Sequence, residues 1–326
     1  MVLKTDHHEI RKRVFFLGTT ASGKTEWAVE GAESVGGVII NCDSVQVYRG
    51  LEIGSASPSR EIQLRVPHFL FNYVPFPQEL SLGDYFRDYQ KEVREIPPQK
   101  PIFIVGGTGF YLRALERGLL EIPPVSVSMV KELEKAVEDP GLNEVLYREL
   151  IKVDPQSSLH IHKNDKYRLV RALAVYRSHG QTPRQFEEAQ LSSKSSSEQL
   201  LKVGIQYSKD ELLHRVKFRV ESMLQSGLLD EVRFFCTQME EQGVDWKKDG
   251  RVWKPLQSIG YREALDHFKG TLDREQLKDE IVLQTMKLIK KQRTWFKRDP
   301  DIQWLGPTEL KKWIVQVKHF FLEDGV

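Results

Sequence analysis

The sequence predicts an α/β fold in which helices flank a parallel sheet and an all-helical segment is inserted between its strands. Three short apolar runs, at residues 14–17, 37–40 and 101–105, are each followed by glycine or a small polar residue, as buried parallel strands are. Helical periodicity follows at least two of these runs. This alternation indicates βαβ units, whose ligand crevice lies at the carboxyl ends of the strands.

The inserted segment is marked by a change of pattern. Three stretches carry helical periodicity with no strand-like run between them: 128–138, 142–152 and 166–178. We therefore divide the chain into a first part of the core at residues 1–120, a helical insertion domain at 121–200 and a second part of the core at 201–326.

The second part of the core mixes both patterns. Two apolar segments, 201–205 and 302–305, are candidate late strands of the same sheet. The Ser-, Gln- and Glu-rich stretch at 190–199 is expected to be a flexible connection from the insertion back to the sheet. From residue 209 onward the pattern is mostly helical, and it ends in a basic helix near residues 283–298.

Composition bounds the class of protein. The 326 residues are 40% hydrophobic and 29% charged, which is enough to bury one good core and a second smaller one and argues against disorder. The formal net charge is only +2, so a nucleic-acid surface would have to come from local clustering of cations. The total charge neither supports nor excludes RNA as a partner.

The cysteine content and the hydropathy of the sequence indicate the cellular compartment of the protein. Cys42 and Cys236 make neither a disulfide framework nor a metal-ligand cluster with nearby histidines, which fits a reducing environment. The sequence has no apolar run of about 18 residues, and the polar residues 1–13 lack the apolar stretch of a signal peptide. We expect a soluble, cytoplasmic protein without a membrane partner.

Residues 18–25 match the phosphate-binding pattern G-x-x-x-x-G-K-[ST] between a predicted strand and an amphipathic helix. Glycines let the backbone turn so that its N–H groups point inward, and the helix N-terminus adds partial positive charge. In this motif Lys24 reaches terminal phosphate oxygens and Thr25 can ligate Mg²⁺. We therefore predict a P-loop NTPase-like core that binds a di- or triphosphate through Gly18, Thr19, Thr20, Ala21, Ser22, Gly23, Lys24 and Thr25.

A P-loop does not determine which bond of the ligand breaks. A kinase or an ATPase would also need an acidic residue after an apolar strand. The third predicted strand runs instead into the glycine turn at 106–109, which offers the Thr108 hydroxyl and backbone donors but no carboxylate. This difference argues against a small-molecule kinase that transfers a phosphoryl group from ATP.

Asp43 follows the second predicted strand and therefore faces the same crevice as Lys24. Its position leaves three roles open. It is a candidate general base, a candidate Mg²⁺ ligand through water, or the N-cap of a following helix.

Seven sequence blocks resemble those of the tRNA dimethylallyltransferase family, in the same order and over most of the chain. They are GTTASGKT at 18–25, DSVQVY at 43–48, GSASP at 54–58, GGTGFY at 106–111, RLVRAL at 168–173, SIGY at 258–261 and KQRTW at 291–295. Ordered blocks of this number are far more specific than a P-loop alone.

The resemblance implies a P-loop core with a tRNA-binding helical insertion, Mg²⁺ as the metal and dimethylallyl pyrophosphate as the donor. The acceptor would be N6 of the adenosine on the 3′ side of the anticodon, presented by the anticodon stem-loop of tRNA. By the same resemblance Asp43 is the base at N6 and Thr108 lies near the scissile oxygen. Together with Lys24 of the P-loop motif they are the expected catalytic residues.

The resemblance also implies which residues bind. Thr25 ligates the metal, and Ser44 and Gln46 hold the acceptor base. The full set of residues expected at tRNA is Asp43, Ser44, Val45, Gln46, Thr108, Tyr167, Arg168, Leu169, Val170, Arg171, Lys290, Gln292 and Trp295.

Two groups of cations have alternatives. Arg215 and Arg219 lie four residues apart and so share one helical face. They are candidates to bind the pyrophosphate, to bind the RNA backbone, or to form ion pairs with Glu211 and its neighbours. We assign Arg219 to the donor pyrophosphate. The segment 287–298, with six cations around two aromatic residues, is either a solvated helix or a phosphate-tracking face, and the resemblance favours RNA.

Some positions depart from the family pattern. Thr19 stands where proline is usual, Tyr167 where glutamine is usual and Lys291 where arginine is common. Over residues 125–130 the expected Asp and Arg are missing, and Lys131 is the nearest cation. These departures indicate a divergent member or an altered tRNA preference.

Two rival functions share much of this sequence evidence. An adenylate isopentenyltransferase would use the same donor with a free nucleotide, but the helical insertion and the basic helix favour tRNA. A non-catalytic tRNA-binding protein would not need Lys24, Thr25, Asp43 and Thr108 together. We therefore expect an enzyme that alkylates tRNA. We also expect a monomer, although no pattern in the sequence determines the oligomeric state.

Overall fold

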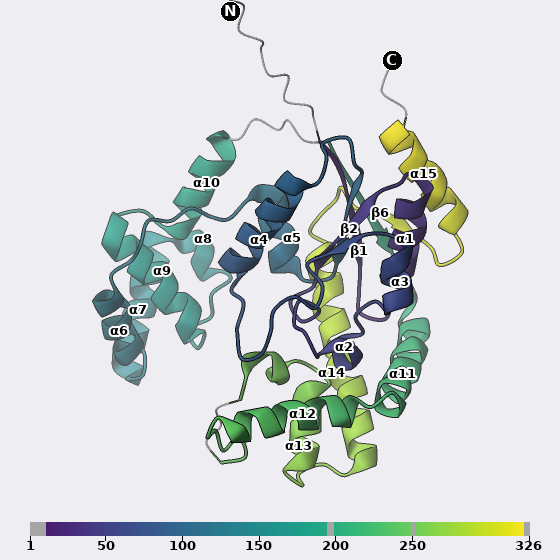
Figure 1. The fold of residues 1–326 in the computed structure, drawn as a ribbon. Helices are drawn as coiled ribbons and strands as arrows, with labels where there is room; N and C mark the ends of the chain where they lie inside the picture. Colours follow the sequence, from purple (N-terminus) through teal and green to yellow (C-terminus); the bar gives the residue numbers. More distant parts are fainter. Residues whose placement is uncertain (1–10, 194–198, 249–251, 323–326) are drawn as a thin grey trace, which may run out of the picture. The chain divides into compact units, whose positions relative to one another are not determined.

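The computed structural model describes residues 11–193, 199–248 and 252–322 (Figure 1). Within them the strands are β1 (Lys12–Gly18), β2 (Val38–Cys42), β3 (His68–Phe69), β4 (Ile102–Gly106), β5 (Gln199–Ile205) and β6 (Gln303–Leu305). They form one sheet in the order β3-β2-β4-β1-β5-β6, and all neighbours pair in parallel. The predicted parallel α/β core is confirmed, including both candidate late strands.

Two groups of helices surround or follow this sheet. The first group is α1 (Lys24–Ser34), α2 (Glu52–Ser55), α3 (Arg60–Arg65), α4 (Leu82–Glu95) and α5 (Gly109–Arg117). The second is α11 (Lys209–Gln225), α12 (Leu228–Glu241), the 3₁₀ turn η1 (Lys254–Gln257), α13 (Tyr261–Phe268), α14 (Arg274–Phe296) and α15 (Leu310–Leu322).

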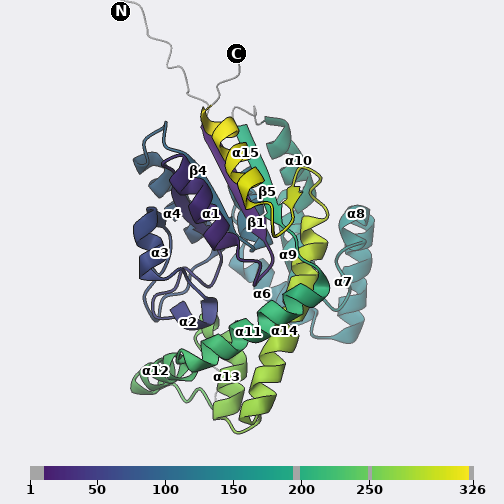
Figure 2. The same ribbon diagram turned by 90° about the vertical axis from the view of Figure 1, so that its right-hand side faces the viewer.

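Helices cover both faces of the sheet, so its strands are apolar on both sides (Figure 2). On one face Phe15 and Ile104 pack with side chains of α4 and α5. On the other face Phe16 and Phe103 pack with α1 and α15, which lie side by side in both ribbon views. A strand covered on both faces shows a continuous apolar run rather than alternation, and that run made the central strands visible in the sequence.

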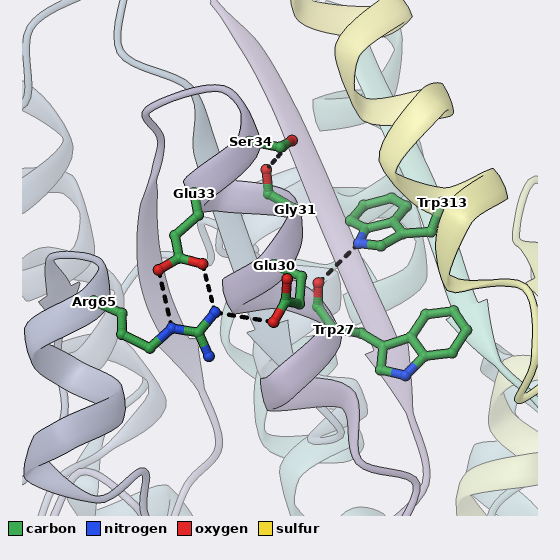
Figure 3. Close-up of polar contacts among 7 residues, drawn as sticks. All are labelled: Trp27, Glu30, Gly31, Glu33, Ser34, Arg65 and Trp313. Carbon is green, nitrogen blue, oxygen red and sulfur yellow. Dashed lines mark hydrogen bonds and ion pairs between the residues drawn. The ribbon is translucent and has the colours of Figure 1, made fainter.

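The helix α1 is anchored from two sides (Figure 3). The indole Nε1 of Trp313 in α15 donates to the Trp27 carbonyl oxygen at 2.8 Å. A Cβ at Gly31 would lie 2.8 Å from the Trp313 ring, so glycine is needed for this close approach. From the other side, Arg65 of α3 pairs with the carboxylates of Glu30 and Glu33. These contacts fix the helix whose first residue is Lys24.

One strand was not predicted from the sequence, and two expectations need correction. The strand β3 was not predicted, because it is only two residues long and lies in a proline-flanked segment. The connection expected at 190–199 is helical up to Ser193 and is part of β5 at Gln199; residues 194–198 lie outside the described residues. The basic helix starts at Arg274, not near residue 283, and α15 follows it; its start is marked by a capping box between Asp273 and Gln276.

The chain divides into two compact units. We call Met1–Glu116 with Ser197–Val326 the core unit, and Arg117–Ser196 the helical unit. The helical unit contains α6 (Val127–Ala136), α7 (Pro140–Val153), α8 (Pro155–Ser158), α9 (Lys166–His179) and α10 (Pro183–Ser193). Its own core is built around Leu133, Leu150 and Leu173. None of the helices in the described ranges combines the length and apolar character that crossing a bilayer requires.

Candidate active site

The P-loop connects the end of β1 to the start of α1, as the motif predicts. A Cβ at Gly18 would lie 2.4 Å from Ser22 Oγ, so the first glycine allows the loop to fold back on itself. Gly23 and Ala21 both have left-handed backbone conformations, with φ of 75° and 64°. Glycine adopts this conformation freely, but for alanine it costs on the order of 1–2 kcal/mol. The loop is therefore held in a shape that its own residues do not all favour.

Two side chains from distant helices bond to this loop. Gln292 of α14 accepts a hydrogen bond from the Thr20 N–H at 3.0 Å through Oε1 and donates to the Gly107 carbonyl oxygen at 3.1 Å through Nε2. Arg215 of α11 donates from Nε to the Ala21 carbonyl oxygen at 2.6 Å. The loop is thus tied both to the glycine turn after β4 and to α11.

A cavity of about 390 Å³, the phosphate pocket, opens beside the start of α1. Lys24 and Thr25 line it from α1, and Arg215 and Arg219 line it from α11. Burial lowers the pKa of Lys24 to about 8, partly offset by the Asp43 carboxylate. Burial also lowers the pKa of Arg219, again opposed by Asp43. Cations that have lost hydration in this way are poised to bind an anion.

A second cavity, of about 260 Å³, adjoins the first, and we call it the apolar cavity. Its wall is mostly hydrophobic and includes Val216, Met223 and Ile281. Asp43 and Arg219 are its charged lining residues. Arg219 lines both cavities, so it marks the junction between them.

Asp43 closes a turn directly after β2. Its Oδ1 accepts hydrogen bonds from the N–H groups of Val45 at 2.9 Å and Gln46 at 3.4 Å. Asp43 is therefore not the N-cap of a helix, since residues 43–48 contain no helix and α2 begins only at Glu52. The turn uses Oδ1, and Asp43 also lines the apolar cavity.

Thr108 lies on the neighbouring strand end and contacts the same turn. Its Oγ1 accepts a hydrogen bond from the Ser44 N–H at 3.3 Å. A Cβ at Gly106 would lie 2.1 Å from the Cys42 carbonyl oxygen, so only glycine lets β4 and β2 approach this closely. The sequence-predicted residues Lys24, Asp43 and Thr108 are thus brought to one edge of the sheet.

Two of the family-like blocks meet in a second set of contacts. A Cβ at Gly54 would lie 2.3 Å from the Tyr261 ring, and the Tyr261 hydroxyl accepts a hydrogen bond from the Ser55 N–H at 2.9 Å. Glu231 accepts from the Gly54 N–H at 3.0 Å and from the Tyr261 hydroxyl at 2.8 Å. Gln46 Nε2 donates to the Ser55 and Ala56 carbonyl oxygens. These contacts shape the wall shared by the two cavities.

The residues expected at tRNA fall into an exposed and a buried group. In the helical unit Tyr167 is 80% exposed, and Arg168 and Arg171 are exposed on the same helix. Leu169 and Val170, at 0% and 5% exposure, belong instead to the core of that unit. Any role of these two in RNA binding is to hold the neighbouring arginines in place.

The same division holds on α14. Lys290 is exposed, whereas the Gln292 amide is engaged inside the core unit. Trp295 packs so closely on the turn after β4 that a Cβ at Gly109 would lie 2.6 Å from its ring. Within one short block, only some side chains face outward.

The residues at the phosphate pocket fit a metal that arrives with its ligand. In the described ranges no three or more His, Cys, Asp or Glu side chains are grouped to hold an ion. Mg²⁺ needs few protein ligands, because it keeps water and binds substrate phosphates. The hydroxyl of Thr25 lines the pocket and Asp43 lies near Lys24, so the oxygen donors suit Mg²⁺ bound together with a phosphate group.

Three contacts were not assigned from the sequence. Glu231, Tyr207 and Asn41 each support a site residue: Glu231 holds α2, the Tyr207 ring lies 4.8 Å from the Arg215 guanidinium, and Asn41 accepts from the Asp43 N–H. Asn41 stands two residues before Asp43, which is a local signal for a turn. Glu231 is far from Gly54 in the sequence, and Tyr207 belongs to no motif, so the sequence carries no signal for either contact.

Comparison with known proteins places these features in a family. The family model described as IPP transferase matches residues 46–299. The tRNA dimethylallyltransferase of Bdellovibrio bacteriovorus is 41% identical over 297 residues, which cover 90% of this chain and 92% of that protein.

Solved structures agree with this result. The full-length tRNA isopentenylpyrophosphate transferase of Bacillus halodurans is 29% identical, with a TM-score of 0.66 over 96% of both chains. A eukaryotic dimethylallyltransferase acting on tRNA is 24% identical and shows the shared fold, with a TM-score of 0.76 over 93% of this chain and 75% of that one. Because the family model spans most of the sequence and the Bdellovibrio relative aligns with nine tenths of it, this chain belongs to the IPP transferase family.

Proposed function

We propose that the protein transfers the dimethylallyl group of dimethylallyl pyrophosphate to N6 of the adenosine on the 3′ side of the anticodon in tRNA. The observation that carries this proposal is the junction at Arg219, where a cationic phosphate pocket meets an apolar cavity bordered by Asp43. This arrangement suits a donor with a pyrophosphate head and a short hydrocarbon tail. The names of the family relatives support tRNA as the acceptor.

The P-loop holds the leaving group in this scheme. As the bond between the allylic carbon and oxygen breaks, negative charge grows on the pyrophosphate. Lys24, Arg219 and the backbone of the loop stabilise that charge. Mg²⁺ bound by Thr25 and phosphate oxygens would neutralise part of it. The fold that transfers phosphoryl groups in other enzymes thus serves here to hold a pyrophosphate that leaves intact.

Asp43 acts as the general base. The adenine amine is a weak nucleophile because its lone pair is delocalised into the ring. As N6 bonds to the allylic carbon, the amine proton passes to Asp43 Oδ2, and the electron pair of the broken C–O bond leaves with the pyrophosphate. Help of this kind is worth on the order of 10² to 10⁴ in rate.

Thr108 is placed to assist the leaving group. Its Oγ1 already accepts the Ser44 N–H, so its own O–H is available as a donor. A hydroxyl directed at the bridging oxygen of the donor would stabilise the charge that develops there. Ser44 and Gln46, on the turn that Asp43 closes, are the proposed contacts of the acceptor base.

The RNA is held by exposed cations. The acceptor base must leave its stack to reach a partly enclosed carboxylate, and bases of an anticodon loop do so at lower cost than bases in a duplex. Arg168, Arg171 and Lys290 are exposed and suited to phosphates, and Tyr167 offers a ring for stacking. Both cavities are built from one chain, so we propose a monomer that acts in the cytoplasm, where its tRNA substrate is found.

The test is transfer of label from dimethylallyl pyrophosphate in the presence of Mg²⁺. The acceptors are an A-rich anticodon stem-loop, total tRNA and AMP. Label in RNA, and none in AMP, supports the proposal. Label in AMP would assign the protein to nucleotide alkylation, and binding of tRNA without label in any acceptor would leave only an RNA-binding role.

A further inference from the structure

We propose that Gln292 and Arg215 form a clamp that holds the P-loop in its anion-binding shape, so that Gln292 is a positioning residue of the donor site. Its place in a basic block suggests an RNA contact, but both functions of its amide are used inside the core unit. The proposal relies on the proposed function only for the identity of the donor. That the loop binds pyrophosphate can be tested without RNA.

The clamp is needed because of Ala21. This residue has a φ of 64°, in the left-handed region that side chains other than glycine rarely adopt. Backbone strain of this kind persists only when the surrounding structure over-determines it, and it is concentrated at ligand-binding loops. An isolated loop with alanine at this position would spend much of its time in other conformations.

The hydrogen bonds of the clamp lie on either side of the strained residue. Gln292 holds the N–H of Thr20, one residue before Ala21. Arg215 holds the carbonyl oxygen of Ala21 itself. The φ and ψ angles of Ala21 therefore lie between two fixed backbone groups.

Each arm of the clamp is itself held. The Gln292 amide also donates to the Gly107 carbonyl oxygen, and a Cβ at Gly107 would lie only 2.7 Å from Nε2, so a side chain there would displace the amide. The guanidinium of Arg215 lies 4.8 Å from the centre of the Tyr207 ring. The helices that carry the arms, α11 and α14, pack against each other. A change at either arm is thus transmitted to the loop rather than absorbed by a mobile side chain.

The side chains of α14 fall into two groups with different proposed roles. Gln292 and Trp295 face the core unit, while Lys287, Lys290 and Lys291 are exposed. The exposed lysines remain available to RNA. Gln292 instead connects the P-loop to the turn that carries Thr108, so it aligns the phosphate pocket with the site of bond breakage.

The experiment compares Gln292→Met with wild type in the absence of RNA. Methionine has a similar length but makes neither hydrogen bond. We expect Mg²⁺-pyrophosphate, measured by calorimetry, to bind about tenfold more weakly, as the loss of one to two hydrogen bonds implies. Affinity for an anticodon stem-loop should change less than twofold. In steady-state kinetics the KM for the donor should rise more than that for tRNA.

A matched control lies two turns earlier on the same helix. The Gln284 amide bonds only to Glu280 of α14 in the described part of the chain, so Gln284→Met should leave pyrophosphate affinity within twofold of wild type. Gln292→Glu provides a second test, because it keeps an acceptor for Thr20 but opposes the Gly107 carbonyl oxygen. It should weaken pyrophosphate binding as well. Thermal unfolding of each variant shows whether it remains folded.

The role of Ala21 has its own test. Glycine adopts positive φ without strain, so Ala21→Gly added to Gln292→Met should recover at least threefold of the lost affinity. Absence of recovery would overturn the claim that the clamp acts on Ala21.

Weaker RNA binding with unchanged pyrophosphate binding in Gln292→Met would overturn the clamp and make Gln292 an RNA contact. A wild type that binds pyrophosphate but transfers nothing refutes the proposed function alone.

Discussion

The two units of this protein place their candidate functional residues in opposite settings. In the core unit Asp43, Thr108 and Gln292 each accept a hydrogen bond from a backbone N–H group of a loop. In the helical unit Tyr167 and Arg171 stand on the outside of a helix. The difference reflects their tasks. Catalytic side chains must be held within a fraction of an ångström of their productive positions. Cations that bind RNA phosphates need only be exposed and able to reach them.

The largest expected effect is the loss of transfer rate in Asp43→Asn, which tests the residues of the core unit. Asp43→Asn keeps an oxygen that accepts from Val45, so the turn after β2 should persist. It removes the base, and we expect the single-turnover rate of transfer to fall on the order of 10² to 10⁴. Binding of an anticodon stem-loop should change less than threefold. A rate within tenfold of wild type would remove Asp43 from the role of base.

A matched control exists in the helical unit. Asp139 also closes a turn through Oδ1, which accepts from Gly141 and Leu142, but it lies at the start of α7. Asp139→Asn should leave the rate of transfer within twofold of wild type. The same substitution at a carboxylate that also accepts from the N–H groups two and three residues on thus separates chemistry from local structure.

A tenfold effect is expected from the titration of Lys24. Its pKa of about 8 in the free protein lies below its ordinary value of 10.5, because burial disfavours the charge. The unfolded chain holds more protons between these values, so stability should rise with pH across that window. Pyrophosphate binding favours the charged form and should do the opposite, weakening about tenfold between pH 7 and pH 9.

Calorimetry at both pH values checks this, with Lys24→Met as the reference. The pyrophosphate has its own titration, but that contribution is common to both proteins and cancels in the ratio of their dissociation constants. The advantage of wild type over Lys24→Met should shrink about tenfold at the higher pH. A constant ratio would show that Lys24 stays charged throughout.

The smallest effect belongs to the RNA surface. Arg171→Gln should remove one phosphate contact, weaken stem-loop binding about fivefold near 0.1 M salt and reduce the salt slope by about 0.7. Pyrophosphate binding should be unchanged. Arg184, which pairs with Glu188 in the same unit, is the control, and Arg184→Gln should alter neither quantity more than twofold. Equal losses in both variants would indicate a general charge effect rather than a contact.

The parts of the site that could be predicted share one property. Lys24, Asp43 and Thr108 follow three separate apolar runs, and the carboxyl ends of parallel strands meet at one edge. Fully buried strands are readable because most of their residues form a continuous apolar run. The strand β3 has two residues and carries too little pattern to be recognised.

The parts of the site that could not be predicted depend on contacts between residues that are far apart in the sequence. Gln292 and Thr20 are separated by 272 positions, and a glutamine among lysines reads as part of a solvated or RNA-binding face. Glu231 meets Gly54 across 177 positions without any local motif. The buried Leu169 beside exposed Arg168 follows from helical periodicity, but a family block does not say which of its members face outward.

The order of the strands has a consequence for protein synthesis. β1 lies between β4, which ends at Gly106, and β5, which begins at Gln199. Every residue of the helical unit is therefore translated after the first partner of β1 and before the second. At roughly 5–20 residues per second, this interval lasts on the order of ten seconds. During that time the nascent chain exposes an apolar strand with one unpaired edge, a surface that favours aggregation until β5 emerges.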